Sequence, residues 1–595
     1  MPSSLPPLPG QPSGQPSGQP YGQPYGQSSG QPYGQQPSGP AGPPPYGGPP
    51  PGSGSPTGGG SRGPRSRTLV ALVGALVAIV LVTAVVVVVV VMNRDDDGGT
   101  DEAGGDRSSD EAGLPDPDED EAGSGLEALE VDDDGRLPAV EVPDESELEV
   151  ARSTPREDSV YPAVGDPGVD ALHYDVDLTY LPDDEVLEGI TRLTFRATTA
   201  AEGFRLDLAP NLEVEEVSLD GSSVDAFRHE DKDLIVDVPV VADQVYEVTV
   251  AYAGPPEPAQ APTTRSDFSG VGLTVSDEPD HEGWLWTMQE PYGAYTWYPV
   301  NDQPSDKALY DFTVYTQPEW KGVANGVLVA DQTTERDGTE MRATRFHTDA
   351  PMSSYLTTLA VGDYVLTEGE SDSGVPLSYW TPAGDDDSLE ALEVTNEALT
   401  WLEAKLGPYP FSSLGSVVVP SESAMETQTM ITYGNTEYTL SPSTIVHEIA
   451  HQWWGNKVSP NDWRDVWMNE GMAMYLQFLW EAEEEGVSRG AYVESYRYED
   501  QLLRDESGPP AAYDPTMFAE SNVYIPPALM WNELHDRIRD QAFWRIARTW
   551  PALEGEDVYR SVGRDEIYPW LSEMAGGDLT AFLDAWLLGT TTPPE

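Results

Sequence analysis

The feature that most constrains the fold of this chain is a pair of histidines one helical turn apart, followed by a distant glutamate. The pair lies in His447-Glu448-Ile449-Ala450-His451, and eighteen residues separate His451 from Glu470. Histidines at i and i+4 lie on the same face of a helix, so both imidazoles can bind one metal ion. Glu470 opens an apolar run where an unpaired carboxylate is costly to bury. The pattern therefore predicts a metal site with His447, His451 and Glu470 as ligands.

The ligand types indicate which metal this site binds. The 595 residues contain no cysteine, so the metal must be held by nitrogen and oxygen. Zinc favours four ligands in a tetrahedron, and catalytic zinc sites keep one position for water. We therefore expect one Zn²⁺ per chain, with Glu448 placed to accept a proton from the zinc-bound water and deliver it to a leaving amine. These parts together indicate hydrolysis of an amide or peptide bond.

Charge excludes one class of partner. The chain has 103 acidic and 31 basic residues, a formal net charge of −72. Such a surface repels nucleic acid and anionic membranes, so we expect no nucleic-acid partner. No Asp or Glu precedes Asp95, and the chain before that point differs in kind from the rest.

The sequence before Asp95 predicts a tail and a membrane anchor. Residues 1–67 repeat the pattern G-Q-P-S/Y and then become Pro/Gly-rich, which predicts a disordered tail. Residues 68–92 contain an uncharged apolar stretch, long enough as a helix (about 36 Å) to cross a ~30 Å hydrocarbon core. Arginines precede this stretch and aspartates follow it, so the positive-inside rule places the tail in the cytoplasm. We expect a single-pass protein of the cell membrane whose catalytic part is extracellular.

The remaining sequence divides into three parts. Residues 93–165 are acidic and Gly-rich, which predicts a flexible, self-repelling stalk. Residues 166–382 contain runs that alternate with period two and are expected to form an all-β domain. In residues 383–595, the expected catalytic domain, the pattern turns helical, and helices are expected at 388–406, 442–454, 465–485, 527–538 and 541–549.

From about residue 169 to residue 595 the chain resembles the aminopeptidase N-like zinc metallopeptidases, which include leukotriene A4 hydrolase. The pattern H-E-x-x-H-x18-E is one basis of this resemblance. The others are Gln452-Trp453-Trp454-Gly455-Asn456, Trp467-Met468-Asn469-Glu470-Gly471, Ser423-Ala424-Met425-Glu426-Thr427, Glu290-Pro291 with Trp297-Tyr298-Pro299-Val300-Asn301-Asp302-Gln303-Pro304 and Lys307-Ala308, and Val523-Tyr524, 54 residues beyond Glu470.

The resemblance implies a fold and a role for each residue. In that family the positions of His447, His451 and Glu470 are zinc ligands, and the position of Glu448 is the general base. The resemblance implies that Glu426 and Glu290 bind the free α-amino group of a peptide substrate and that Tyr524 stabilises the tetrahedral oxyanion. It also implies a saddle-like β-sandwich domain, followed by a thermolysin-like α+β, mainly helical catalytic domain with aminopeptidase activity.

Departures from the family pattern leave two alternatives open. Ser423 and Thr427 replace the usual Gly and Asn, and Pro526-Pro527 replaces a basic residue and a glycine. The sequence stops 71 residues after Tyr524, so we expect a short form that lacks the large C-terminal helical domain of many relatives. An open cleft would suit a zinc endopeptidase of the same fold. The other alternative is a catalytically inactive surface-binding relative.

Overall fold

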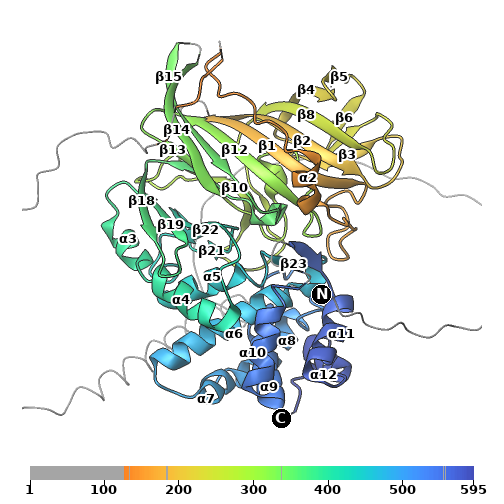
Figure 1. The fold of residues 1–595 in the computed structure, drawn as a ribbon, viewed down its shortest axis with the longest axis vertical. Coiled ribbons are helices and arrows are strands. Elements are labelled where there is room, and N and C mark those ends of the chain that lie inside the picture. Colours follow the sequence, from red (N-terminus) through yellow and green to blue (C-terminus); the bar gives the residue numbers. More distant parts are fainter. Residues whose placement is uncertain are drawn as a thin grey trace, which may run out of the picture. The chain divides into compact units, whose positions relative to one another are not determined.

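The computed structural model of the protein describes residues 126, 128–132, 134–182, 185–336, 338–553, 555 and 558–594. These residues form a β-rich domain followed by a mainly helical domain (Figure 1). The expected tail and apolar span (residues 1–92) lie outside these ranges. Across the ranges given above, no helix has both the length and the apolar character needed to cross a bilayer.

The largest sheet of the β-rich domain has nine strands. They are β1 (Val169–Leu181), β2 (Val186–Ala197), β4 (Glu213–Leu219), β5 (Ser222–Ser223), β8 (Val245–Gly254), β12 (Lys307–Thr316), β14 (Val327–Arg336), β15 (Thr339–His347) and β16 (Met352–Ser353). The order is β14-β15-β12-β1-β2-β8-β4-β5, with β16 paired to β12. β1 runs parallel to β12 and antiparallel to β2.

Two smaller sheets complete this domain within the described residues. The five-stranded sheet comprises β9 (Ala259–Gln260), β10 (Gly270–Val275), β11 (Leu285–Met288), β13 (Lys321–Ala324) and β17 (Leu359–Gly362), in the order β13-β17-β11-β10-β9. The three-stranded sheet comprises β3 (Phe204–Asp207), β6 (Phe227–Glu230) and β7 (Asp233–Val236), in the order β3-β7-β6. Short 3-10 turns η3 (Ala294–Thr296) and η4 (Ser354–Leu356) lie between strands.

Burial along the strands follows from which faces are covered. In β8, buried residues alternate with more exposed ones, which confirms the period-two pattern in the sequence. β1 is buried along nearly its whole length. Its inward side chains, such as Val176 and Leu178, belong to the apolar core. Its acidic side chains Asp175 and Asp177 point to the other face and need partners there.

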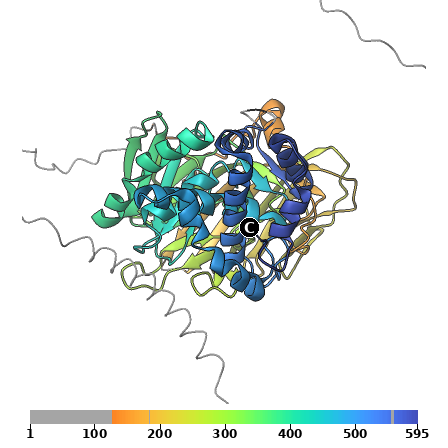
Figure 2. The ribbon, with the colours of Figure 1, turned by 90° about the horizontal axis from the view of Figure 1, so that it is seen from below.

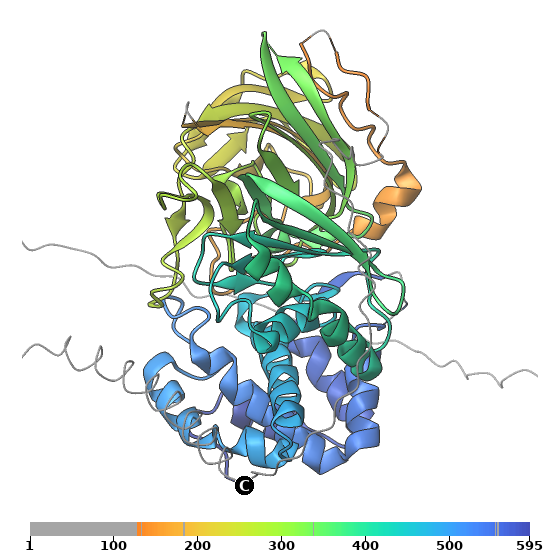
Figure 3. The same ribbon diagram turned by 90° about the vertical axis from the view of Figure 1, so that its left-hand side faces the viewer.

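The prediction of a flexible stalk is wrong for residues 134–165, because this segment supplies partners for the acidic face of β1. This segment contains α2 (Glu145–Leu148) and η1 (Glu149–Ala151) and runs along the β-rich domain (Figure 3). Arg136 pairs with Asp177 at 2.9 Å, and the Leu137 N–H donates to the Tyr315 hydroxyl at 2.7 Å. The acidic composition predicted a solvated chain, but the contacts of Arg136 and Leu137 bind the segment to the sheet.

The sheet of the helical domain has five strands within the part of the chain described. They are β18 (Tyr364–Glu370), β19 (Pro376–Pro382), β20 (Leu414–Val419), β21 (Ala424–Met425) and β22 (Met430–Gly434), in the order β18-β19-β20-β22-β21. β19, β20 and β22 are parallel, and the two edge strands are antiparallel to their neighbours. The sequence assigned β18 and β19 to the β-rich domain. That assignment is wrong because β19 pairs with β20, and period two does not indicate which sheet a strand joins.

Helices cover this sheet and form the lower part of the molecule, as the view from below shows (Figure 2). They are α3 (Asp386–Leu392), α4 (Thr395–Leu406), α5 (Pro442–His451), α6 (Trp467–Glu484), α7 (Arg489–Glu494), α8 (Arg497–Ser507), α9 (Ile525–Ile538), α10 (Asp540–Thr549), α11 (Arg564–Ala575) and α12 (Thr580–Leu587). The domain also contains η5 (Trp463–Asp465), η6 (Ser521–Val523) and the paired strands β23 (Val458–Pro460) and β24 (Arg560–Val562).

Helices form at all five expected places, with ends that differ from the expected ones by up to three residues and with one expected helix divided in two. Residues 388–406 form two helices, α3 and α4, instead of one. α5 ends at His451, three residues before the expected end. It begins where Ser441 accepts from the N–H of Thr444 and Pro442 occupies the first turn, both standard signals for a helix start.

Candidate active site

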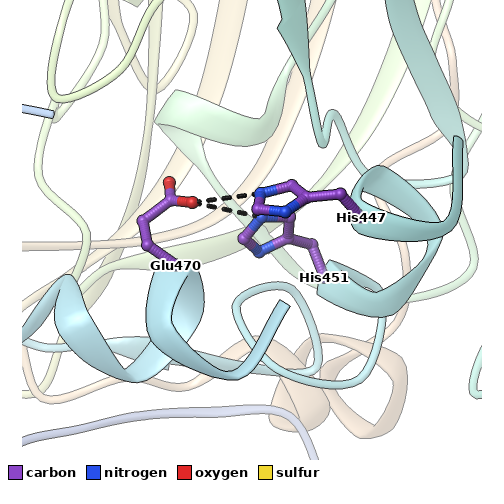
Figure 4. A group of neighbouring side chains, drawn as sticks. All are labelled: His447, His451 and Glu470. Carbon is purple, nitrogen blue, oxygen red and sulfur yellow. Dashed lines mark hydrogen bonds and ion pairs between the residues drawn. The ribbon is translucent and has the colours of Figure 1, made fainter. Parts of the chain in front are cut away.

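Three side chains from two helices converge on one point. α5 carries His447 and His451, and α6 carries Glu470 (Figure 4). Glu470 Oε2 lies 3.3 Å from His447 Nε2 and 3.5 Å from His451 Nε2. All three residues are buried, and one ligand atom from each lies within 4.8 Å of the others. The structure therefore brings together the three residues that the sequence predicts as ligands.

A backbone contact orients His451. Its Nδ1 lies 3.2 Å from the carbonyl oxygen of Trp454. When Nδ1 carries the proton and donates it to that oxygen, Nε2 keeps its lone pair for a metal. Gly455 follows with a φ of 135°, a backbone conformation that favours glycine, and a Cβ there would lie 3.3 Å from His451 Nδ1. Glycine therefore lets the chain turn closely around the imidazole.

Three more buried glutamates surround the ligands. One ligand atom from each of Glu426, Glu448 and His451 lies within 4.8 Å of the others, and the same holds for Glu290, Glu426 and Glu470. Oε1 of Glu290 and Oε1 of Glu426 are buried without a hydrogen-bond partner among the described residues. Buried carboxylates at this density require cations, because isolated buried charges are strongly unfavourable.

The pKa values of the site residues are shifted by the same crowding of buried carboxylates. Burial and the neighbouring carboxylates raise the pKa of Glu448 and of Glu290 well above the usual range. Burial alone would raise the pKa of Glu470, but His451 and His447 outweigh it and lower that pKa to about 2. Burial alone would lower the pKa of His451, but Glu426 and Glu470 outweigh it and raise that pKa to about 10. The donor set favours a positive charge at this point and fits Zn²⁺, which would take the place of the histidine proton.

The side chains of Gln452 and Asn456, which follow α5, hold the backbone of Glu426 in place. The backbone carbonyl of Glu426 accepts from Asn456 Nδ2 at 2.7 Å and from Gln452 Nε2 at 3.2 Å. Lys307 of β12 donates to the carbonyl of Asn456 at 2.6 Å and to Ser459 Oγ at 2.7 Å. The sequence contained Asn456 and Gln452 as parts of a motif without a role, and it gave no signal for this role of Lys307.

Thr427 and Ser423 take up places in the sheet. Thr427 is fully buried, donates to the carbonyl of Met430 and lies 3.0 Å from the Thr432 hydroxyl. The carbonyl of Ser423 accepts from the N–H of Gly434 at 2.9 Å. The departures from the family pattern at these positions therefore leave the backbone around Glu426 hydrogen-bonded.

Glu290 lies on the loop that follows β11, next to a cis peptide bond to Pro291. Gln289 anchors this loop. Its Nε2 donates to the carbonyls of Thr357 at 2.7 Å and Ser354 at 3.2 Å, and its Oε1 accepts from Trp297 Nε1 at 3.0 Å. The sequence analysis gave no role to Gln289, because its partners lie up to 68 residues away.

Tyr524 lies between η6 and α9, with its ring stacked on His447 at 6.1 Å between centroids. Pro526 and Pro527 form the first turn of α9, and a Cβ on Gly471 would lie 2.3 Å from Pro527, so α6 and α9 pack closely here. Burial and Glu470 raise the pKa of Tyr524, and Arg265 opposes this shift. The sequence analysis also gave no role to Arg265.

The β-rich domain, the mixed sheet of the helical domain, and the buried His/His/Glu site with Glu448 between its ligands form the arrangement expected of a two-domain metallopeptidase. Residues 170–356 match the Peptidase M1 N-terminal domain, and residues 390–586 match the Peptidase family M1 domain. The chain therefore belongs to peptidase family M1, as the sequence motifs predicted.

Curated relatives are aminopeptidases. The chain is 24% identical to glutamyl aminopeptidase of Sus scrofa, over 61% of this chain and 41% of that protein. It is 32% identical to endoplasmic reticulum aminopeptidase 2 of Bos taurus, over 32% of this chain and 21% of that protein. The chain thus spans less than half the length of these curated relatives.

Solved structures show the same fold. The M1 zinc metallopeptidase of Deinococcus radiodurans matches with a TM-score of 0.63 and 24% identity, over 73% of this chain and 98% of that chain. A mutant of that enzyme bound to a Tyr-Ser-Ala substrate matches with a TM-score of 0.63 and 25% identity, over the same shares of the two chains. These solved structures are named zinc metallopeptidases, and the donor set of His447, His451 and Glu470 in this chain fits the same metal.

Proposed function

We propose that the protein is a zinc aminopeptidase that removes N-terminal residues from peptides. One observation carries the proposal: Glu290 and Glu426 each have a buried carboxylate oxygen beside the metal ligands with no hydrogen-bond partner among the described residues. The names of the curated relatives and the tripeptide bound to a solved relative support the choice of substrate.

The two carboxylates suit a protonated amine. An N-terminal ammonium group offers three donors, and Glu290 and Glu426 each offer an acceptor oxygen without a hydrogen-bond partner among the described residues. A bound ammonium group favours the ionised form of both carboxyls. Binding the amine there fixes the position of the first peptide bond relative to the metal site. This register places the first peptide bond at the metal site, so one residue is removed per cut. A peptide with a blocked N-terminus lacks the ammonium cation that binds to these two carboxylates.

The remaining residues supply the chemistry of hydrolysis. Zn²⁺ held by His447, His451 and Glu470 would polarise the scissile carbonyl and acidify the attacking water. Glu448, which lies between the two histidine ligands on α5, accepts a proton from that water and delivers it to the leaving amine. Tyr524 donates its phenol O–H to the developing oxyanion, a contact worth about 3 kcal/mol in the transition state.

The test is Glu426→Ala in the full chain, assayed on peptides with a free N-terminus. We expect kcat/KM to fall by roughly a hundredfold or more, because the charged partner of the amine is lost. Glu422→Ala is the matched control, since Glu422 lies four residues earlier, is exposed, and should leave the rate unchanged. Unchanged kinetics for Glu426→Ala would favour a zinc endopeptidase instead.

We also propose that residues 68–92 anchor the protein in the cell membrane, with the tail in the cytoplasm and the catalytic domain outside. The support is the uncharged apolar stretch from Leu69 to Met92, with arginines before it and aspartates after it. Protease added to intact cells should release the catalytic domain, and deletion of residues 68–92 should move activity to the soluble fraction. A full chain already found in the soluble fraction would contradict the anchor.

A further inference from the structure

A loop of the β-rich domain binds the segment that precedes Tyr524. The loop is residues 262–267, between β9 and β10. The N–H of Phe518 donates to the carbonyl of Pro262 at 2.9 Å. Oε1 of Glu520 accepts from Thr263 Oγ1 at 3.1 Å and from Thr264 Oγ1 at 2.6 Å. The position of Tyr524 in the helical domain is therefore coupled to a loop of the other domain.

Arg265 is the residue of this loop that points to Tyr524. Its Nη1 lies 3.0 Å from the carbonyl oxygen of Ala519 and 3.5 Å from the Tyr524 hydroxyl oxygen. Asp267 holds the other side of the guanidinium, with Oδ1 3.2 Å from Nε and Oδ2 2.5 Å from Nη2. Because the guanidinium is planar, contacts on two of its sides fix the direction of the remaining donor.

These contacts leave Arg265 little capacity to bind a substrate itself. A guanidinium has five N–H donors. Four of them are directed to Asp267, Ala519 and Tyr524. The carbonyl that Arg265 binds belongs to Ala519, which has a φ of 52°, a conformation uncommon for a residue other than glycine. Arg265 therefore stabilises an unusual backbone turn directly before Tyr524.

The chemistry of the two groups determines which one donates. Arginine has no acceptor, so the Tyr524 oxygen must be the acceptor in this contact. The phenol hydrogen is then directed away from Arg265 and remains available to donate to another partner. A charged donor on the phenol oxygen also polarises its O–H bond and makes it a stronger donor.

We propose that Arg265 is a positioning residue for Tyr524: it orients the phenol O–H toward the reacting carbonyl and strengthens its donation to the oxyanion. This proposal rests on the proposed function, because it requires Tyr524 to act in peptide hydrolysis. The β-rich domain then contributes two residues to the reaction: Glu290, which binds the substrate amine, and Arg265, which positions Tyr524.

A double-mutant cycle on the full chain tests the proposal. The proteins are wild type, Arg265→Gln, Tyr524→Phe and the double mutant, each checked for zinc content and thermal midpoint. We expect Arg265→Gln to lower kcat roughly tenfold with KM changed less than about twofold, and Tyr524→Phe to lower kcat roughly 10²–10³-fold. In the Tyr524→Phe background, Arg265→Gln should cost less than about twofold, because residues that act through one contact are not additive.

Two further measurements separate a positioning role from other roles. Arg265→Lys keeps a positive charge and should recover part of the lost kcat. The lysine variant also tests the proposal if Arg265→Gln folds poorly. The loss in kcat should be equal for substrates with acidic, basic and apolar N-terminal residues.

Distinct results would overturn the proposal. A tenfold loss from Arg265→Gln in both tyrosine backgrounds would show that Arg265 acts independently of Tyr524. A loss confined to acidic substrates and seen in KM would make Arg265 a carboxylate-binding residue instead. An inactive wild type with full zinc content would contradict the proposed function. An active wild type whose kcat is unaffected by Arg265→Gln would contradict only this inference.

Discussion

The side-chain amide of Asn456 donates to the backbone carbonyl of Glu426 over 2.7 Å. This contact links the segment after α5, the helix that carries His447 and His451, to Glu426, which we propose binds the substrate amine. Lys307 of the β-rich domain in turn donates to the carbonyl of Asn456 at 2.6 Å. The metal site and the amine site are therefore connected through one buried asparagine, which predicts that this residue matters although it touches neither metal nor substrate.

Asn456→Ala should lower kcat/KM roughly tenfold, the size expected for a partner that orients an active-site group. The stability loss should be only about 1 kcal/mol, because the Glu426 carbonyl keeps its bond from Gln452. Steady-state kinetics and a thermal melt measure the two effects. Asn396→Ala, at a half-buried asparagine of α4, is the control, and equal kinetics in both variants would contradict a positioning role.

Glu448→Gln should lower kcat by roughly 10²–10⁴-fold and leave the zinc content at one per chain. The glutamine has nearly the same shape but cannot accept the proton. Zinc content matters here because Glu426, Glu448 and His451 form a second possible ligand group. Zinc measured by atomic absorption should be retained in Glu448→Gln and lost in His447→Ala. Loss of zinc from Glu448→Gln would make Glu448 a ligand.

Removing zinc with a chelator should lower the thermal midpoint and abolish activity together. Four buried glutamates and two histidines lie close together, and without the metal the repulsion between the carboxylates is offset only by protonation of the site. Binding at a thousandfold excess over Kd contributes about 4 kcal/mol to stability. Scanning calorimetry before and after chelation measures the shift, and adding zinc back should restore it. A midpoint independent of zinc would argue against a buried metal site.

Stability should depend on pH through Lys307. Burial lowers the pKa of this lysine from 10.5 to about 7. Between these two values the unfolded chain binds a proton that the folded chain does not, so this contribution to stability rises as the pH rises, by up to about 1.4 kcal/mol per pH unit. Below about pH 7 the cost of burying the charge is fully present.

The measurement compares urea unfolding of wild type and Lys307→Met from about pH 7 to pH 10. The wild type should gain stability relative to the variant across this range, because methionine has no proton to lose. A constant difference between the two proteins would show that Lys307 stays charged in the folded state. Lys321→Met, at a lysine that is less buried, is the matched control.

Local sequence patterns predicted the metal site because its geometry is local. The i, i+4 spacing of His447 and His451 fixes their relative position once α5 forms. Glu470 was predicted from its place at the start of an apolar helix, and α6 brings it to the histidines. The β-rich character of the N-terminal domain likewise follows from an alternation that extends over only a few residues.

The residues that the sequence analysis missed are bound by long-range contacts. Arg265 and Tyr524 are 259 positions apart, and Lys307 and Asn456 are 149 apart. No local period predicts such a pair, because the pairing depends on how the two domains pack. The same reason explains the error at β19, whose partner strand is set by the helical domain, and the error at residues 134–165, whose partner is the acidic face of β1.

The most direct test of the central claim is hydrolysis by the full chain of matched peptides with free and with N-acetylated termini, beside Glu448→Ala as a blank. The account predicts cleavage of the free-amine peptides alone, one residue at a time, and loss of all cleavage in the variant or with a chelator. Cleavage of the acetylated peptides would contradict an amine site at Glu290 and Glu426 and would indicate an endopeptidase. No cleavage by zinc-loaded protein would indicate an inactive binding relative.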